Sequence, residues 1–143
     1  ADPEKYREVV FCGLGESTLR YDLVLDLGKA LKAKGCKTRL DTDGLASLRE
    51  GRDVTGELAE AFDAVSVSLN AADGETYQHL CPSKFGEKAW ESSVEFLRSA
   101  RGKFSRIIAS VVSHPDLEIE PARKLVEDEL GIEFRVRKYN EVG

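Results

Sequence analysis

The residues best suited to chemistry in this sequence stand at the end of its first apolar run. The run at 8–11 is followed by Gly13, Gly15 and Glu16, and Ser17-Thr18 opens a helical pattern. This order predicts a buried parallel strand, a glycine loop and a helix with a hydroxyl cap. Ligands in parallel α/β folds bind beyond the carboxyl ends of strands, so we expect the carboxylate of Glu16 to reach a pocket.

Two kinds of ligand are compatible with this loop. A dinucleotide cradle of the form G-x-G-x-x-G accounts for Gly13 and Gly15, and Asp41 lies near the spacing of the acidic residue in such folds. However, Thr18 stands at the third glycine, and the negative charge of Glu16 repels a pyrophosphate. A cationic group such as an α-ammonium suits Glu16 directly, so the charge favours an ammonium site.

Polar side chains alternate with apolar ones in the segment 64–70. Ser66, Ser68 and Asn70 alternate with valine and leucine at the period of a strand. Small closed barrels fill their interior with branched apolar residues, so a polar inner stripe predicts an open interior that holds a ligand. A half-exposed edge strand is the alternative.

The segment 133–139 repeats this pattern with charged side chains. Arg135 and Arg137 share one face, and Phe134 and Val136 share the other. An inward guanidinium requires an anion, either an acidic side chain of the site or a ligand carboxylate. The alternative is an edge strand whose arginines face solvent.

A third polar group closes the segment 37–42, which reads as a strand. Asp41, Thr42 and Asp43 stand at its carboxyl end, just before Gly44. They are candidates for the same site, because carboxyl ends of parallel strands meet at one edge of a sheet. Ordinary turn and cap chemistry is an equal alternative, since Asp-Gly turns are common.

The ordered set of these elements resembles the radical S-adenosylmethionine superfamily, and within it the TatD-associated radical S-adenosylmethionine proteins. The elements are Gly-Leu-Gly-Glu-Ser-Thr at 13–18, Thr-Asp-Gly at 42–44 and Ser-Val-Ser-Leu-Asn-Ala at 66–71, and the resemblance spans 6–143. It implies that the first element holds the methionine amino group, the second ends the next strand, and the third meets ribose or carboxylate. With Arg135 added, the implied S-adenosylmethionine-binding set is Gly13, Gly15, Glu16, Ser17, Thr42, Asp43, Ser66, Ser68, Asn70 and Arg135.

The sequence departs from the family pattern at three points. Ser17 replaces the usual proline, Asp43 replaces the usual asparagine, and the C-x-x-x-C-x-x-C motif of the first strand is absent. The resemblance therefore implies a parent protein with a four-iron four-sulfur cluster whose ligands this chain lacks. No metal ligand and no catalytic residue is assigned here.

The resemblance implies a parent enzyme that cleaves S-adenosylmethionine reductively to a 5′-deoxyadenosyl radical. Such an enzyme requires an external electron donor, and its substrate is unknown. Two alternatives remain at this point. One is a non-catalytic module that binds an adenosyl ligand or a nucleotide, and the other is a dinucleotide-dependent oxidoreductase.

The composition of the chain indicates which classes of binding partner to expect. The 143 residues are 41% hydrophobic and 33% charged, and the net charge of −5 disfavours nucleic acid as the main partner. No apolar run has the roughly 20 residues of a membrane helix, and the first residues lack a signal peptide, so we expect no membrane partner and a cytoplasmic location. Cys12, Cys36 and Cys81 are expected to be reduced thiols.

The whole pattern predicts an α/β fold, namely an incomplete, open parallel β/α barrel of about five strands alternating with helices. It forms a single partial domain over 1–143, whereas a full barrel takes roughly 250 residues. In the first helix, the stripe formed by Leu23, Leu27 and Leu31, widened by Val24 and Ala30, is expected to face the sheet. Because the sequence has no methionine, we expect a slice of a longer protein whose first strand, at 9–11, is a bare edge prone to self-association.

Overall fold

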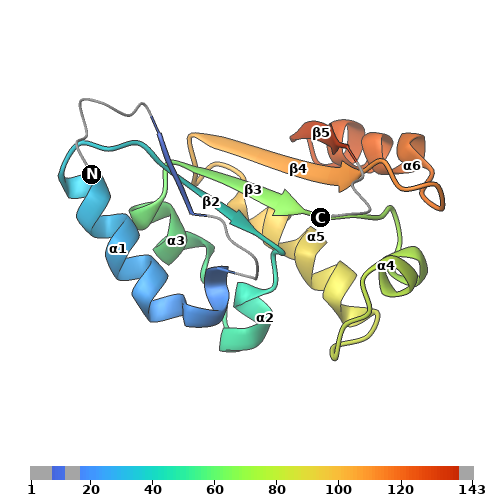
Figure 1. Ribbon diagram of the computed structural model, residues 1–143, viewed down its shortest axis with the longest axis horizontal. Helices are drawn as coiled ribbons and strands as arrows, with labels where there is room; N and C mark the ends of the chain where they lie inside the picture. Colours follow the sequence, from blue (N-terminus) through green and yellow to red (C-terminus); the bar gives the residue numbers. More distant parts are fainter. Residues whose placement is uncertain (1–7, 12–16, 139–143) are drawn as a thin grey trace.

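The computed structural model describes residues 8–11 and 17–138, and it arranges five strands in one parallel sheet (Figure 1). The strands are β1 (Val9–Phe11), β2 (Thr38–Thr42), β3 (Ala64–Ser68), β4 (Arg106–Val112) and β5 (Glu133–Arg137). The helical segments are η1 (Ser17–Arg20), α1 (Tyr21–Ala33), α2 (Ala46–Glu50), α3 (Thr55–Ala61), α4 (Gly74–Leu80), α5 (Lys88–Ala100), α6 (Ile119–Arg123) and η2 (Lys124–Glu129). The predicted fold class, an open parallel α/β arrangement, is confirmed.

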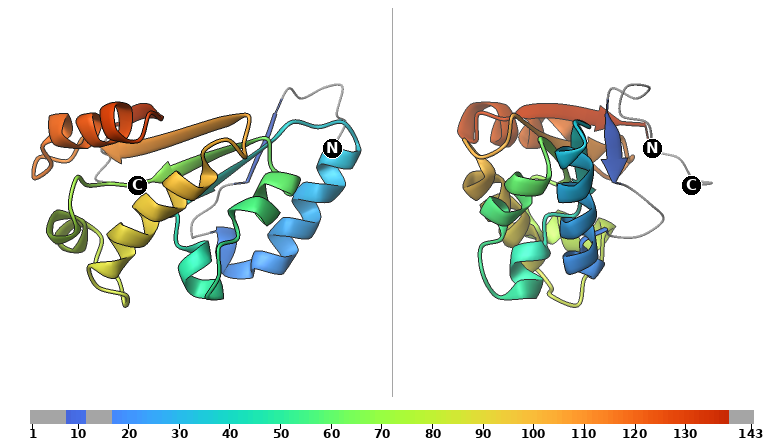
Figure 2. Two further views of the ribbon diagram at one scale, coloured as in Figure 1. Left: turned by 180° about the vertical axis from the view of Figure 1, so that it is seen from behind. Right: turned by 90° about the vertical axis from the view of Figure 1, so that its left-hand side faces the viewer.

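The sheet has the strand order β1-β2-β3-β4-β5, so each strand pairs with the next one along the chain. Right-handed crossovers between such neighbours place all connecting helices on one face. Figure 1 shows α1, α2, α3 and α5 together on one side of the strands, and the turned views in Figure 2 agree. Within the described residues the sheet does not close into a barrel, because β1 and β5 each have a single neighbour.

The helix-covered face of the sheet is apolar. Val65, Val67 and Leu40 are fully buried there, and so are Phe62 and Leu97 on the helix side. Burying a side chain of this size contributes roughly 1.5–3 kcal/mol relative to exposure. The predicted alternation in the segment 64–70 is therefore confirmed, with its valines facing the helices.

The opposite face, which we call the open face, carries polar side chains from four strands. Seven of them lie together around one hollow, namely Arg39, Asp41, Ser66, Ser68, Ser110, Arg135 and Arg137. They alternate along β2, β3 and β5 with residues that face the helices. The sheet register brings them into rows, because paired residues of parallel strands point to the same side.

Helix α1 packs through a different face from the one that its leucine spacing predicts. Leu23 and Leu27, which we expected against the sheet, are 49% and 46% exposed. The buried positions of α1 are Tyr21, Val24 and Gly28. The prediction was right for Val24 and wrong for Leu23 and Leu27, because it counted large apolar residues and ignored the glycine.

Gly28 explains why this other face packs. A Cβ atom at Gly28 would lie 2.9 Å from the ring of Phe62, 3.0 Å from the Cβ of Ala61 and 3.1 Å from its carbonyl oxygen. These distances are shorter than normal van der Waals contact. The missing side chain thus allows α1 to approach α3 closely, and the helix turns its leucine stripe outward.

Strand β1 is an edge strand among the described residues. Val9, Val10 and Phe11 are half-buried, whereas the sequence predicted a strand buried on both faces. Phe11 still contributes to the core, since its ring packs edge-to-face on Phe62 at a centroid distance of 5.1 Å. The other edge of β1 has no strand partner in the part of the chain that the structure describes.

Two helix predictions between β3 and β4 are confirmed. Asp73 caps α4, because its carboxylate accepts a hydrogen bond from the backbone N–H of Thr76 at 2.7 Å. Val94 and Leu97 of α5 face the core. Trp90 on the same stripe donates its indole N–H to the carbonyl of Ala71 at 3.0 Å, which ties α5 to the end of β3.

Candidate functional site

The open face presents one cross-strand row of hydrogen-bond donors near the carboxyl ends of the strands. Ser68 of β3 pairs in register with Ser110 of β4, which pairs with Arg135 of β5. Arg137 lies two residues further along β5, on the same side of the sheet. The row therefore brings two hydroxyls and the guanidinium groups of β5 together on the open face of β3, β4 and β5.

These side chains line a hollow of about 130 Å³. Its lining consists of Arg39, Asp41, Ser66, Ser68, Ser110, Arg135 and Arg137. The lining is more polar than apolar, which suits a ligand bound through hydrogen bonds and charge. Three of the residues predicted for the site, Ser66, Ser68 and Arg135, meet here.

Ion pairs hold the amino-terminal part of the open face. Arg39 donates to the carboxylate of Asp41 at 3.2 Å. Arg106 forms a bidentate pair with Glu133 at 3.0 and 2.8 Å, and Arg135 contacts the same carboxylate at 3.1 Å. The hydrogen bond from Arg106 lowers the pKa of Glu133 below its usual range, so this carboxylate stays ionised.

Arg137 has a neutral partner. Its Nη2 donates to the hydroxyl of Ser68 at 3.0 Å, and it forms no ion pair with any residue that the structure describes. The hydroxyls of Ser66 and Ser110 make no hydrogen bond within the described chain, although Ser110 is only 3% exposed. The hollow thus contains unused hydrogen-bonding capacity.

Asn70 lies just beyond β3 in a strained backbone conformation. Its φ of 63° is in the left-handed region, and the N–H groups of Leu69 and Asn70 both donate to the carbonyl of Ser110. The amide Nδ2 donates to the Sγ of Cys81 at 3.5 Å, while the buried Oδ1 has no hydrogen-bond partner. An orphan acceptor beside the carboxyl end of a strand is a sign of a ligand contact.

Cys81 is not an activated thiol in this arrangement. Burial raises the pKa of the Cys81 thiol, and this effect exceeds the opposing influence of Asn70 and of the Arg137 charge. The thiol therefore serves as a weak hydrogen-bond partner of Asn70.

The structure separates Thr42 and Asp43 from this group. Thr42 lies two residues after the buried Leu40, so its side chain faces the helices as that of Leu40 does. The hydroxyl of Thr42 accepts a hydrogen bond from the N–H of Gly44 at 3.2 Å. Asp43 pairs with Arg49 at 2.6 Å and caps the following turn through the N–H of Leu45 at 2.9 Å. Thr42 and Asp43 therefore stabilise the turn after β2, which was the alternative to a role in ligand binding. At this end of β2, the residue on the open face is Asp41.

Four predicted residues follow β1 in the sequence. Gly13, Gly15 and Glu16 lie outside the described residues, and Ser17 is the first residue of η1. Their assignment to the site stays a prediction.

Sequence reasoning missed Ser110, for which the register is decisive. Ser110 lies in an otherwise apolar stretch of β4, and no local pattern distinguishes it. It joins the site only because β4 pairs with β3 so that Ser110 stands opposite Ser68. The arginine of β2, Arg39, was detectable because it shares the period of two with Asp41.

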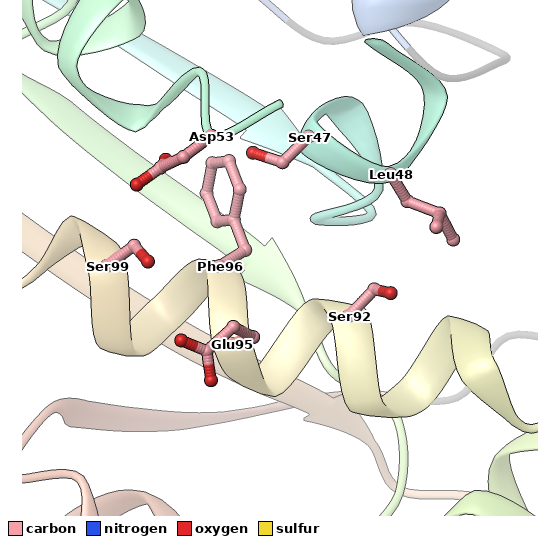
Figure 3. Close-up of a pocket in the computed structure, with 7 residues that line it drawn as sticks. All are labelled: Ser47, Leu48, Asp53, Ser92, Glu95, Phe96 and Ser99. Carbon is pink, nitrogen blue, oxygen red and sulfur yellow. The ribbon is translucent and has the colours of Figure 1, made fainter. Parts of the chain in front are cut away.

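A second hollow, of about 240 Å³, lies between α5 and the α2–α3 connection (Figure 3). Figure 3 shows Phe96 standing between Asp53 and Ser47, with Ser92 and Ser99 along α5. Both carboxylates of this groove and one of its hydroxyls are already engaged. Asp53 accepts the N–H of Thr55, Glu95 pairs with Arg98, and Ser47 accepts the N–H of Val54. This groove is a weaker candidate than the open face.

Both histidines of the chain lie near one carboxylate, an arrangement that the sequence did not reveal. His79 Nε2 lies 3.7 Å and His114 Nδ1 lies 3.9 Å from the carboxylate of Asp116. Asp116 and His79 are well exposed, and the backbone N–H of Asp116 donates to His114 Nδ1 at 3.0 Å. The contact links the end of α4 to the loop after β4.

Residues 8–11 and 17–138 contain neither a metal centre nor a membrane-spanning helix. No group of three or more histidine, cysteine, aspartate and glutamate side chains is placed to hold a metal ion there. In the same residues, none of the helices combines the length and apolar character needed to span a bilayer.

Comparison with known proteins gives no family for this chain. No family model matches the sequence, and no curated protein matches it significantly.

Proposed function

We propose that the open face is one wall of an S-adenosylmethionine pocket, and that the chain belongs to a radical S-adenosylmethionine enzyme. The observation that carries this proposal is the hollow lined by Ser66, Ser68 and Arg135 at the carboxyl-terminal half of a singly wound parallel sheet. The family resemblance of the sequence supplies the identity of the ligand.

The described residues fit the chemistry of this ligand. Ribose hydroxyls both donate and accept, which matches the free hydroxyls of Ser66 and Ser110. A methionine carboxylate matches a guanidinium, and the unpartnered Oδ1 of Asn70, which lies outside the lining of the hollow, is a further acceptor for an N–H or O–H group. When bound, S-adenosylmethionine supplies a carbon–sulfur bond whose reductive cleavage yields a 5′-deoxyadenosyl radical.

The iron–sulfur cluster does not fit the described residues in the same way. Cys36 is buried and Cys81 is engaged with Asn70, and no metal-binding group occurs among residues 8–11 and 17–138. We therefore assign the chain a part in ligand binding and derive no step through the cluster. The parent enzyme would also require an external electron donor and a substrate.

A non-catalytic module that binds an adenosyl ligand or a nucleotide is the second candidate. The groups in the hollow suit it, because hydroxyls, guanidinium groups and the ion-paired Asp41 offer hydrogen bonds and charge, which are all that ligand binding requires. Binding without turnover by the full-length parent protein would support this candidate over the enzyme.

We further infer a cytoplasmic location and self-association through β1. The described thiols, Cys36 and Cys81, are both free, as expected in a reducing compartment. Two surfaces can bind a protein partner: the edge of β1 that has no strand partner among the described residues, and the outward leucines of α1. A second copy offers a matching strand and a matching helix.

Calorimetric titration of the chain with S-adenosylmethionine tests the proposal. Ser68→Ala removes one neutral hydrogen bond, so we expect affinity to fall roughly fivefold, equivalent to about 1 kcal/mol. Asn70→Ala should have an effect of similar size. Ser92→Ala on α5, far from the open face, is the matched control and should bind normally.

The proposal fails if the unmodified chain shows no saturable heat with S-adenosylmethionine. It also fails if Ser68→Ala and Ser92→Ala bind equally well, since the hollow would then not be the ligand site.

A further inference from the structure

The hollow on the open face is a positive region on an acidic protein. Three arginines and one aspartate line it, and together with the ion-paired Glu8, Arg106 and Glu133 they carry one net positive charge, whereas the whole chain carries a net charge of −5. A concave surface lined by one sign of charge raises the local concentration of oppositely charged ligands.

The carboxylates nearby neutralise the other arginines and leave Arg137. Asp41 and Glu8 pair with Arg39 at 3.2 and 3.5 Å, and Glu133 is shared between Arg106 and Arg135. After these pairs are formed, the guanidinium of Arg137 remains with only the Ser68 hydroxyl as its partner among the described residues.

The neutral groups around Arg137 are also suited to an anion. Ser68 and Ser110 stand side by side in the sheet register, and a serine hydroxyl can donate to an oxyanion. Because the Ser68 hydroxyl accepts from Arg137, its own proton is available for another acceptor. A guanidinium with two adjacent hydroxyls is a donor set for a carboxylate or a phosphate.

We propose that Arg137, Ser68 and Ser110 form a subsite for an oxyanion group of the ligand. The ligand class is thus an adenosyl compound that carries a carboxylate or a phosphate, and a neutral nucleoside lacks the group that this subsite binds. This inference deepens the proposed function and rests on it only for the adenosyl part of the ligand.

The test uses the full chain and two simple probes, acetate and inorganic phosphate, at constant ionic strength with chloride as the balancing anion. Titrations are followed by the amide resonances of the ¹⁵N-labelled protein. We expect saturable shifts at Ser68, Ser110 and Arg137 with at least one probe. The probe with the higher affinity identifies carboxylate or phosphate as the preferred group.

Arg137→Gln should weaken this binding roughly tenfold or more, because it removes a hydrogen bond to a charged group. Arg137→Lys keeps the charge and should recover part of the affinity. Arg98→Gln is the matched control, since Arg98 is an exposed arginine on α5 paired with Glu95, and it should bind as the unmodified chain does. Arg137 is exposed, so unchanged amide spectra of the free variants would confirm that the fold is intact.

The inference is overturned if neither probe gives saturable shifts at these residues, or if Arg137→Gln binds both probes as tightly as the unmodified chain. Titration with adenosine distinguishes failure of this inference from failure of the proposed function. If acetate or phosphate binds through Arg137 while adenosine and S-adenosylmethionine do not bind, the oxyanion subsite stands and the S-adenosylmethionine assignment fails.

Discussion

Replacing Gly28 by alanine tests the packing of α1 on α3. In an exposed helix, alanine in place of glycine stabilises by about 1 kcal/mol. At Gly28, however, the new Cβ would meet the Phe62 ring at 2.9 Å and the Ala61 carbonyl oxygen at 3.1 Å. The carbonyl belongs to helix backbone and cannot rotate away, so the two helices must separate.

Overpacking of this kind costs about 1–3 kcal/mol. Subtracting the gain in helix propensity leaves a net destabilisation of about 0–2 kcal/mol for Gly28→Ala. Gly56 in α3 is the matched control, because a Cβ there meets no atom within 4 Å. We expect Gly56→Ala to stabilise by up to about 1 kcal/mol, so the two variants should differ by roughly 1–3 kcal/mol.

Equilibrium urea denaturation followed by circular dichroism measures both values. The slope of the transition should be unchanged, because neither change alters the surface exposed on unfolding. If Gly28→Ala is as stabilising as Gly56→Ala, α1 does not approach α3 closely. The leucine stripe of α1 would then be the better candidate for its packed face.

Three further outcomes are expected. Glu133→Gln should lower the melting temperature near pH 7 but have no effect well below pH 4. The hydrogen bond from Arg106 lowers the pKa of Glu133, so the stabilisation by this carboxylate is lost as the pH falls through the lowered pKa. An equal effect of the substitution at both pH values would contradict this. Leu23→Lys should reduce self-association measured by light scattering over a concentration series, whereas Lys34→Ala at the end of the helix should not, and a monomer at all concentrations before mutation would exclude self-association. Glu16→Gln should weaken S-adenosylmethionine binding by roughly 1.5–3 kcal/mol in calorimetry if its carboxylate accepts the ammonium, and unchanged affinity would remove Glu16 from the site.

The strand faces were predictable because each strand has one face under helices and one face without them. In β3 and β5 the side chains alternate between apolar and polar, and the structure places Val65 and Val67 on the covered face and Ser66 and Ser68 on the open face. The period of two is fixed by strand geometry, so a local pattern is enough.

The face of α1 was not predictable in the same way. A helix presents several overlapping stripes, and Leu23 and Leu27 define a larger apolar stripe than Tyr21, Val24 and Gly28 do. The choice between them depends on how closely α3 approaches, which is a tertiary property. A glycine in a helix lowers its intrinsic stability, so its presence is itself a signal of close packing.

The site was predictable where it depended on one strand and unpredictable where it depended on two. Ser66 and Ser68 follow from the alternation within β3. Ser110 belongs to the site because the register between β3 and β4 places it beside Ser68. Thr42 does not belong to the site, because it is two residues from the buried Leu40 and therefore faces the helices. A sequence-level argument about strand ends locates the edge of the sheet but does not choose which side chains turn toward the open face.

The outward leucines and the β1 edge must act together if a second copy binds. Leu19, Leu23 and Leu27 are 66%, 49% and 46% exposed, so covering all three on both copies yields roughly 5–10 kcal/mol, given 1.5–3 kcal/mol for a whole leucine side chain. Association costs about 4–15 kcal/mol in lost freedom, so burial of the leucines is of the same size as this cost. Backbone hydrogen bonds along β1 and burial of its side chains supply the margin. A charged residue at Leu23 removes burial from both copies, so it is expected to weaken association even though it leaves the strand edge intact.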